Sequence, residues 1–116
     1  MALSGSDRIE TGLGNDVVQA GVGRDVVIAG DGRDRIDAGG GNDRLIGGLG
    51  ADTFVFAGRA GSDVVVDFDR GVDRLDLPAG RPQVIDEDAG ARVRFAGGSV
   101  LLLGVDAAEL TADLFI

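Results

Sequence analysis

The 116-residue chain contains no cysteine, histidine, lysine, tryptophan or tyrosine. Without histidine or cysteine it can form no Ser/His or Cys/His dyad, no zinc or haem site with the usual ligands, and no disulfide framework. No apolar run approaches the roughly 20 residues that a membrane-spanning helix needs. The sequence therefore predicts no catalytic residues and no membrane span.

Positive charge is also scarce. The chain has 20 acidic residues, of which 17 are aspartate, against 11 arginines, and its net charge is -9. This charge argues against binding to nucleic acid or to an anionic membrane, because both present phosphates. Glycine and proline make up about a fifth of the residues, which would suit a disordered linker, but 44% of the residues are hydrophobic. The excess of aspartate over glutamate needs a separate cause.

Aspartate recurs every nine residues through the first half of the chain. The six positions are Asp7, Asp16, Asp25, Asp34, Asp43 and Asp52. Glycine lies two residues before each aspartate, at Gly5, Gly14, Gly23, Gly32, Gly41 and Gly50. Five of the six have a second glycine two residues earlier, at Gly12, Gly21, Gly30, Gly39 and Gly48. Two residues after each aspartate comes an apolar side chain, at Ile9, Val18, Val27, Ile36, Leu45 and Phe54.

This nine-residue unit, x-G-x-G-x-D-x-U-x, predicts one turn followed by one short strand. The glycines allow a positive φ in the turn, and the apolar residue U faces one side of a strand of about three residues. One unit cannot bury its own apolar residue, so copies must stack. Two units of 18 residues would make one coil of a flattened spiral, with strands about 4.8 Å apart between coils.

Such stacking places the aspartates in two rows. Asp7, Asp25 and Asp43 would line one edge of the spiral, and the intervening aspartates the other. Carboxylates about 5 Å apart repel one another unless a cation lies between them. Calcium accepts six to eight oxygen ligands, backbone carbonyls included, and suits such a site better than magnesium.

The unit resembles the nonapeptide of the RTX (repeats-in-toxin) calcium-binding family, G-G-x-G-x-D-x-U-x. Residues 39–45 (GGGNDRL) and 47–54 (GGLGADTF) match best, whereas Ala20, Ala29 and Ala38 replace the first glycine. The resemblance implies an all-β fold, a right-handed parallel β-roll with two short strands and two Gly/Asp turns per coil. Residues 2–55 would form the roll and residues 56–116 a capping segment, within one structural domain.

The resemblance also implies that each calcium ion lies between turns 18 residues apart, bound by both aspartates and by glycine carbonyls. The pairs 7/25, 25/43, 16/34 and 34/52 give four ions, and Asp63 with Asp43 offers a fifth. The implied metal ligands are Asp7, Gly12, Gly14, Asp16, Gly21, Gly23, Asp25, Gly30, Gly32, Asp34, Gly39, Gly41, Asp43, Gly48, Gly50, Asp52 and Asp63.

After residue 56 the period breaks. Residues 51–77 resemble the segment that follows the repeats in secreted RTX proteins of the serralysin type. Within it a run of aspartates either binds a further ion or marks the outward face and turn of a hairpin: Asp67, Asp69, Asp73 and Asp76. A hairpin is expected about Gly97 and Gly98, and a short helix over 106–110. The acidic cluster at 86–88 is expected in a turn and is a poor acid/base pair, because nothing apolar surrounds it.

The last four residues are Asp113, Leu114, Phe115 and Ile116. An aspartate followed by three apolar residues resembles the carboxyl-terminal signal of proteins exported by type I secretion. A final strand of the cap would explain the same residues. With the repeats, the motif suggests a secreted, extracellular protein whose partners are calcium and the type I secretion machinery.

Two functions remain open on the sequence. The first is a calcium-dependent module that stays unfolded in the cytosol, assists secretion of a larger protein and folds outside the cell. The second is a polysaccharide- or surface-binding module resembling those of alginate epimerases, with Arg24, Arg33, Arg35 and Arg44 as a basic stripe. An enzyme is the weakest alternative, and any catalysis would belong to another part of a parent protein.

Overall fold

The computed structural model describes residues 7–56, 61–69, 72–78 and 82–110. These residues contain eleven strands and one 3-10 turn, η1, but no α-helix. The strands of the repeats are β1 Arg8–Glu10, β2 Val17–Gln19, β3 Val26–Ile28, β4 Arg35–Asp37, β5 Arg44–Ile46 and β6 Thr53–Val55. The later elements are β7 Gly61–Val65, β8 Arg74–Asp76, β9 Gln83–Glu87, β10 Gly90–Phe95, β11 Gly98–Leu103 and η1 Ala107–Glu109.

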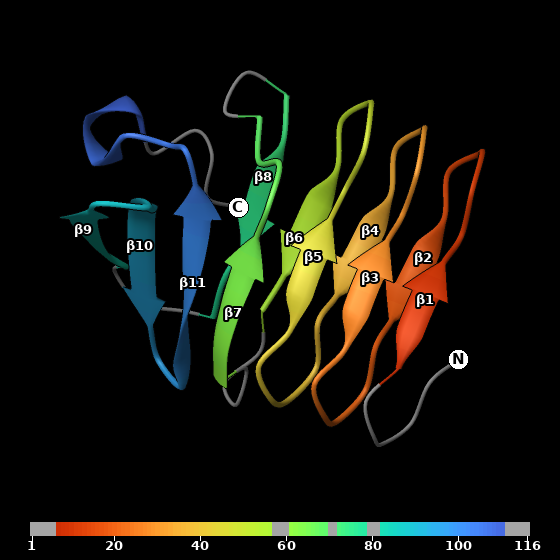
Figure 1. Ribbon diagram of the computed structural model, residues 1–116, viewed down its shortest axis with the longest axis horizontal. Coiled ribbons are helices and arrows are strands. Elements are labelled where there is room, and N and C mark those ends of the chain that lie inside the picture. Colours follow the sequence, from red (N-terminus) through yellow and green to blue (C-terminus); the bar gives the residue numbers. More distant parts are fainter. Residues whose placement is uncertain (1–6, 57–60, 70–71, 79–81, 111–116) are drawn as a thin grey trace.

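Strands β1 to β8 alternate between two sheets, as Figure 1 shows. Sheet A has the order β1-β3-β5-β7-β11-β10-β9, and sheet B the order β2-β4-β6-β8. Within the repeats each strand pairs in parallel with the strand two units later, so that Ile9 lies beside Val27 and Val18 beside Ile36. This 18-residue register is that of a parallel β-solenoid with two strands per coil, which confirms the predicted all-β fold and its parallel stacking.

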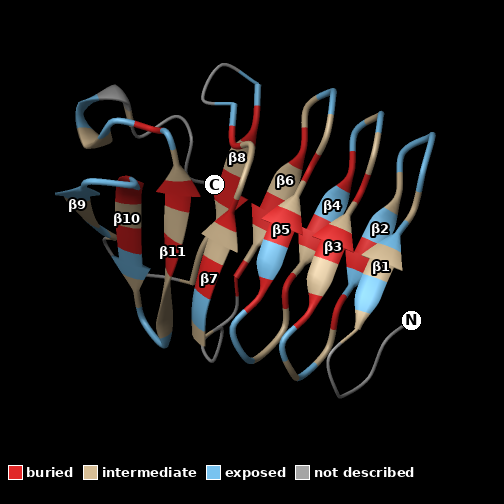
Figure 2. Ribbon diagram, in the orientation of Figure 1, coloured by how far each residue is buried: buried red, intermediate tan, exposed pale blue. Residues whose placement is uncertain are grey.

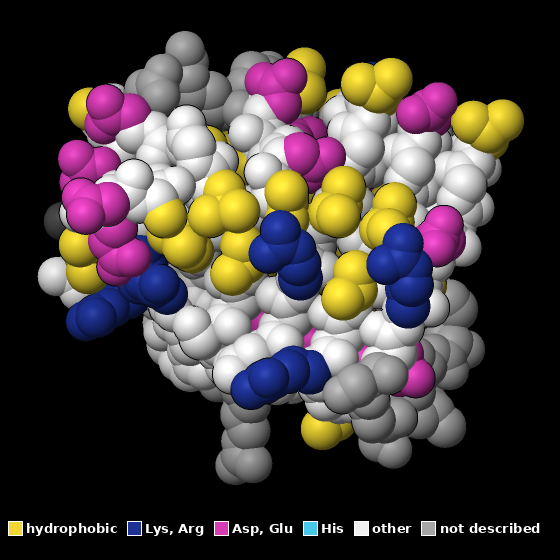
Figure 3. All heavy atoms as spheres, viewed as in Figure 1, with side chains coloured by type: hydrophobic (Ala, Val, Ile, Leu, Met, Phe, Trp, Pro, Cys, Tyr) yellow, Lys and Arg dark blue, Asp and Glu magenta, His cyan; other side chains and the backbone are white. Residues whose placement is uncertain are grey.

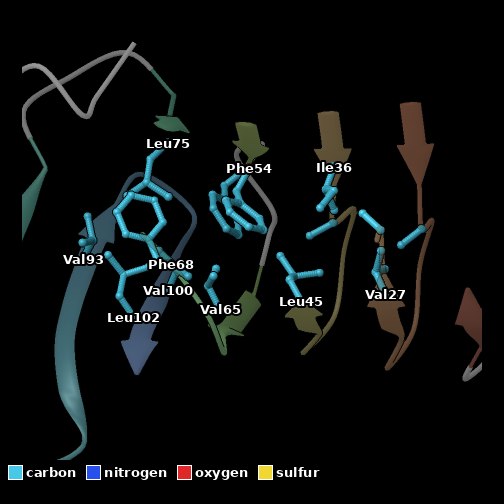
Figure 4. Close-up of a cluster of buried hydrophobic side chains, with 14 of the residues drawn as sticks. Val27, Ile36, Leu45, Phe54, Val65, Phe68, Leu75, Val93, Val100 and Leu102 are labelled. Carbon is cyan, nitrogen blue, oxygen red and sulfur yellow. The ribbon is translucent and has the colours of Figure 1, made fainter. Parts of the chain in front are cut away.

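The core lies between the two sheets. In the repeats the strands are three residues long, so the central side chain points inward while its neighbours point outward. The residues that follow four of these strands are also buried, at Ala20, Ala29, Ala38 and Phe56, and β10 and β11 each contribute two buried apolar residues. Figure 2 shows buried residues at the strand centres and exposed residues in the loops at both edges. The labelled side chains in Figure 4 fill the space between the sheets, and the rings of Phe54 and Phe68 lie 6.2 Å apart. Stacked copies therefore bury what one unit cannot.

The C-terminal segment continues sheet A beyond the repeats. β11 pairs in parallel with β7, and β10 pairs antiparallel with both β11 and β9. Sheet B ends at β8. The segment thus lengthens one sheet, and the ring of Phe95 on β10 packs 5.7 Å from that of Phe56.

Two local predictions in this segment differ from the structure. The acidic cluster expected in a turn begins on a strand, because Asp86 and Glu87 end β9, which pairs with β10. Residues 106–110 contain no α-helix but only the 3-10 turn η1, before which Asp106 accepts a hydrogen bond from the N–H of Ala108 at 3.1 Å. Five residues are too few to offset the cost of helix nucleation. None of the described residues lies in a helix that is long and apolar enough to cross a membrane.

Candidate metal centre

Eight aspartates form two rows, one along each edge of the roll. The first row is Asp7, Asp25, Asp43 and Asp63, and the second row is Asp16, Asp34, Asp52 and Asp73. In both rows the Oδ1 atom of each aspartate after the first accepts a hydrogen bond from the backbone N–H of the aspartate one coil earlier. The six N–O distances lie between 2.8 and 3.0 Å. The rows are thus held together by the backbone, with the carboxylates stacked.

The second carboxylate oxygen of these residues is buried without a protein partner. This is true of the Oδ2 atoms of Asp7, Asp16, Asp25, Asp34, Asp43, Asp52 and Asp63. The last five of these residues are at most 3% exposed. Burying a carboxylate oxygen without a hydrogen bond or a counter-charge costs free energy, and few buried polar atoms in proteins lack a partner. These seven oxygens at equivalent positions form a set to which a bound cation would supply the positive charge.

Burial raises the pKa of the carboxyl groups along the rows. The pKa rises from 3.8 to about 6 for Asp43, about 7 for Asp52 and about 8 for Asp63. Desolvation is the largest cause in each case, and repulsion by the neighbouring aspartates of the row also raises the pKa, whereas backbone hydrogen bonds lower it. The pKa of Asp34 is raised for the same reasons. A cation between the carboxylates would remove this penalty.

Glycines allow the stacked turns that precede the aspartates to approach one another closely. Gly41 has a φ of +92°, and a Cβ atom on it would collide with the carbonyl oxygen of Gly23, one coil earlier. The same holds for Gly30 above Gly12 and for Gly50 above Gly32. The carbonyl oxygens of the earlier glycine in each pair therefore point along the roll axis toward the next coil. Only a glycine in that coil, which has no Cβ atom, leaves room for them.

The donor set fits calcium. It consists of carboxylate and carbonyl oxygens alone, which are the ligands of a hard cation. No group of three or more Asp or Glu side chains suited to a metal ion occurs among the described residues. Two aspartates of adjacent coils would therefore need glycine carbonyls to complete a shell of six to eight oxygens. All the implied ligand residues from Asp7 to Asp63 lie in these turns, with Asp63 in line with Asp43 as expected.

The sequence did not identify Asp73 as a member of the second row. It follows Asp52 by 21 residues, so the nine-residue period conceals it. One signal was available, because residues 73–76 (DRLD) repeat the pattern of residues 34–37 (DRID). The partner strands β6 and β8 align Thr53 with Arg74, which carries Asp73 into register.

The remaining aspartates of this run have protein partners. Asp67 accepts hydrogen bonds from the backbone N–H groups of Gly47 and Gly48, at 2.9 and 2.8 Å. Asp76 lies 3.1 Å from the guanidinium of Arg35. Asp69 donates its backbone N–H to Oδ2 of Asp73 at 2.8 Å. These contacts give the run a structural role at the end of the roll.

The predicted arginine stripe is divided between the two edges. Arg33 and Arg35 line a groove of about 430 Å³ beside the second row, together with Arg74. Arg24 and Arg44 line a smaller groove of about 250 Å³ beside the first row. The face in Figure 3 shows arginines standing apart among hydrophobic side chains. The single stripe is therefore wrong, because successive repeats alternate between edges. The secretion motif, Asp113 to Ile116, lies outside the described residues, as does Gly5.

Comparisons with known proteins agree with this geometry. A profile of the RTX calcium-binding nonapeptide repeat, in four copies, matches residues 1–35 and 19–54. The AlgE6R3 subunit of the mannuronan C5-epimerase of Azotobacter vinelandii is 31% identical, with a TM-score of 0.76; the match covers 100% of this chain and 80% of that one. For the AlgE6R2 subunit of the same enzyme the identity is 31% and the TM-score 0.72, covering 100% and 92%. The comparison with curated proteins gave no match.

Proposed function

Because the chain belongs to the family of RTX calcium-binding repeat modules, we propose that its two aspartate rows are the calcium sites and that filling them folds the roll. The observation that carries the proposal is the set of seven buried Oδ2 atoms without a partner. Bound calcium would supply the positive charge that these oxygens lack. The aspartates of adjacent coils and the carbonyl oxygens of Gly12, Gly14 and their equivalents would hold each ion.

Charge balance supports coupled folding. The chain carries a net charge of -9, and the four divalent ions of the nonapeptide pairs would reduce it to about -1, so that a fifth would bring it to about +1. Without ions the carboxylates within each row repel one another. Each repeat contributes only one inward strand residue per nine to the core, whereas ordering the backbone costs about 1 to 2 kcal/mol per residue. Binding free energy then becomes folding free energy.

We further propose that the module acts outside the cell and assists type I secretion. Residues 56–116 would cap the roll within one domain, and the continuity of sheet A from β7 into β11 supports this. Extracellular calcium modules have dissociation constants of about 10⁻⁴ to 10⁻³ M, so the chain would stay unfolded in the cytosol and fold after export.

The secretion role is tested by export of the chain from cells that carry a type I exporter. A variant with residues 113–116 all changed to alanine should accumulate in the cell, whereas the unchanged chain appears in the medium. The exposed Asp88, changed to alanine, serves as a control for charge at the C-terminal segment. Equal export of the alanine variant and the unchanged chain would exclude residues 113–116 as the signal.

A second candidate function is polysaccharide binding, favoured by the likeness to epimerase modules. The groove beside the second row is lined by Arg33, Arg35 and Arg74, and also by Asp16, Asp34 and Asp52 of the row itself. With calcium bound at these aspartates, the three guanidinium groups would be left to bind the carboxylates of an acidic glycan.

Retention on immobilised mannuronan in the presence of calcium tests this function. Changing both Arg33 and Arg74 to alanine should abolish retention, whereas Arg94→Ala, an exposed arginine on β10, should leave it unchanged. No retention of the unchanged chain, or equal retention of all three proteins, would rule out this groove as the glycan site.

A further inference from the structure

The two rows of aspartates end differently. Up to their last members they are equivalent, because the Oδ1 atoms of Asp63 and Asp73 cap the N–H groups of Asp43 and Asp52 at 2.8 and 2.9 Å. Both terminal aspartates are buried, at 0% and 1% exposure. The difference lies in the second oxygen of each carboxylate.

The end of the first row keeps the geometry of the repeats. The Oδ2 atom of Asp63 is buried without a partner, like those of Asp25 and Asp43 before it. Gly61 has a φ of +80°, and a Cβ atom on it would collide with the carbonyl oxygen of Gly41. Asp63 thus presents the same unpartnered oxygen, and its turn stacks on the turn of Gly41 in the same way, although its spacing from Asp43 is 20 residues instead of 18.

At the end of the second row, backbone N–H groups donate to both oxygens of the terminal carboxylate. The Oδ2 atom of Asp73 accepts a hydrogen bond from the backbone N–H of Asp69 at 2.8 Å. With Oδ1 bound to the N–H of Asp52, both oxygens of this carboxylate have backbone partners. A carboxylate that accepts two backbone N–H bonds has less need of a cation.

A second carboxylate closes the same turn. In the regular coils the first residue of a turn donates its N–H to a carbonyl of the next coil, as Ala20 does to Asp37 and Ala29 to Ile46, both at 2.9 Å. In the last turn Gly47 and Gly48 donate to the side chain of Asp67 instead. A side chain from the following segment therefore replaces the next repeat.

We propose that the two edges of the roll take unequal numbers of ions: three along the first row, the last between Asp43 and Asp63, and two along the second row, where Asp67 and Asp73 replace a third. The proposal rests on the proposed calcium function. It places an ion between Asp43 and Asp63, whose spacing of 20 residues departs from the nonapeptide pattern. It places none between Asp52 and Asp73, although this pair continues the second row. The total is five ions.

Non-denaturing mass spectrometry of the calcium-loaded protein tests this count. The unchanged chain should carry five ions, Asp63→Asn four, and Asp73→Asn five with a lower thermal unfolding midpoint. Loss of an ion from Asp73→Asn, or no loss from Asp63→Asn, would overturn the proposal. A chain that binds no calcium at all would instead refute the proposed function.

A crystal structure of the unchanged chain with calcium gives the same answer if either variant fails to fold. An anomalous peak should lie between Asp43 and Asp63, and none between Asp52 and Asp73. A peak at the second position, or none at the first while other pairs are filled, would overturn the unequal loading.

Discussion

Replacing Asp34 by alanine is expected to weaken calcium binding by at least about 100-fold. Asp34 lies in the middle of the second row, between Asp16 and Asp52, and is 3% exposed. Its Oδ1 atom holds the previous coil, and its Oδ2 atom is buried without a partner. Loss of residues that only support metal ligands costs about 10- to 100-fold in affinity, and Asp34 would itself serve two ions.

Two matched variants separate a ligand effect from a charge effect in calorimetric titrations. Asp31→Ala removes the same charge from an exposed site in the same turn and should leave the affinity nearly unchanged. Asp7→Ala acts at the end of the first row, next to one coil only, and should cost less than Asp34→Ala. Equal losses for Asp7 and Asp34 would contradict the stacked arrangement of sites.

The repeat region could be predicted from sequence because its contacts are periodic. A strand of three residues with one inward side chain fixes the register of every copy, so that Ile36 must lie beside Val18 and Phe54. The two rows follow from the same arithmetic. The unpartnered oxygens could not be predicted, because they depend on which carboxylate atom the backbone N–H of the neighbouring coil selects.

The end of the roll could be predicted only in part. Asp63 was expected beside Asp43, whereas Asp73 was not placed in the second row, because the interval of 21 residues from Asp52 departs from the nine-residue period. The hairpin of β10 and β11 was foreseen as a cap, but its parallel pairing with β7 joins Val64 to Leu101, 37 residues later. Such pairing depends on which edge strand of a sheet has no neighbour on one side.

Removing calcium is expected to unfold the repeats. The folded chain buries seven carboxylate oxygens without partners, and each such group costs about 1 to 3 kcal/mol or more. The total of about 7 to 21 kcal/mol is of the same size as the roughly 5 to 15 kcal/mol by which whole domains are stable. The small core between the sheets cannot compensate for a loss of this size, so the metal-free chain should lose its β-structure.

Far-ultraviolet circular dichroism during a calcium titration, followed by a chelator and then by excess calcium, measures this directly. We expect a disordered spectrum without calcium, a β-rich spectrum at millimolar calcium, loss of that spectrum on chelation, and its return when calcium is restored. Magnesium at the same concentration should not replace calcium. A β-rich spectrum that persists unchanged after chelation would contradict the claim that filling the aspartate rows folds the roll.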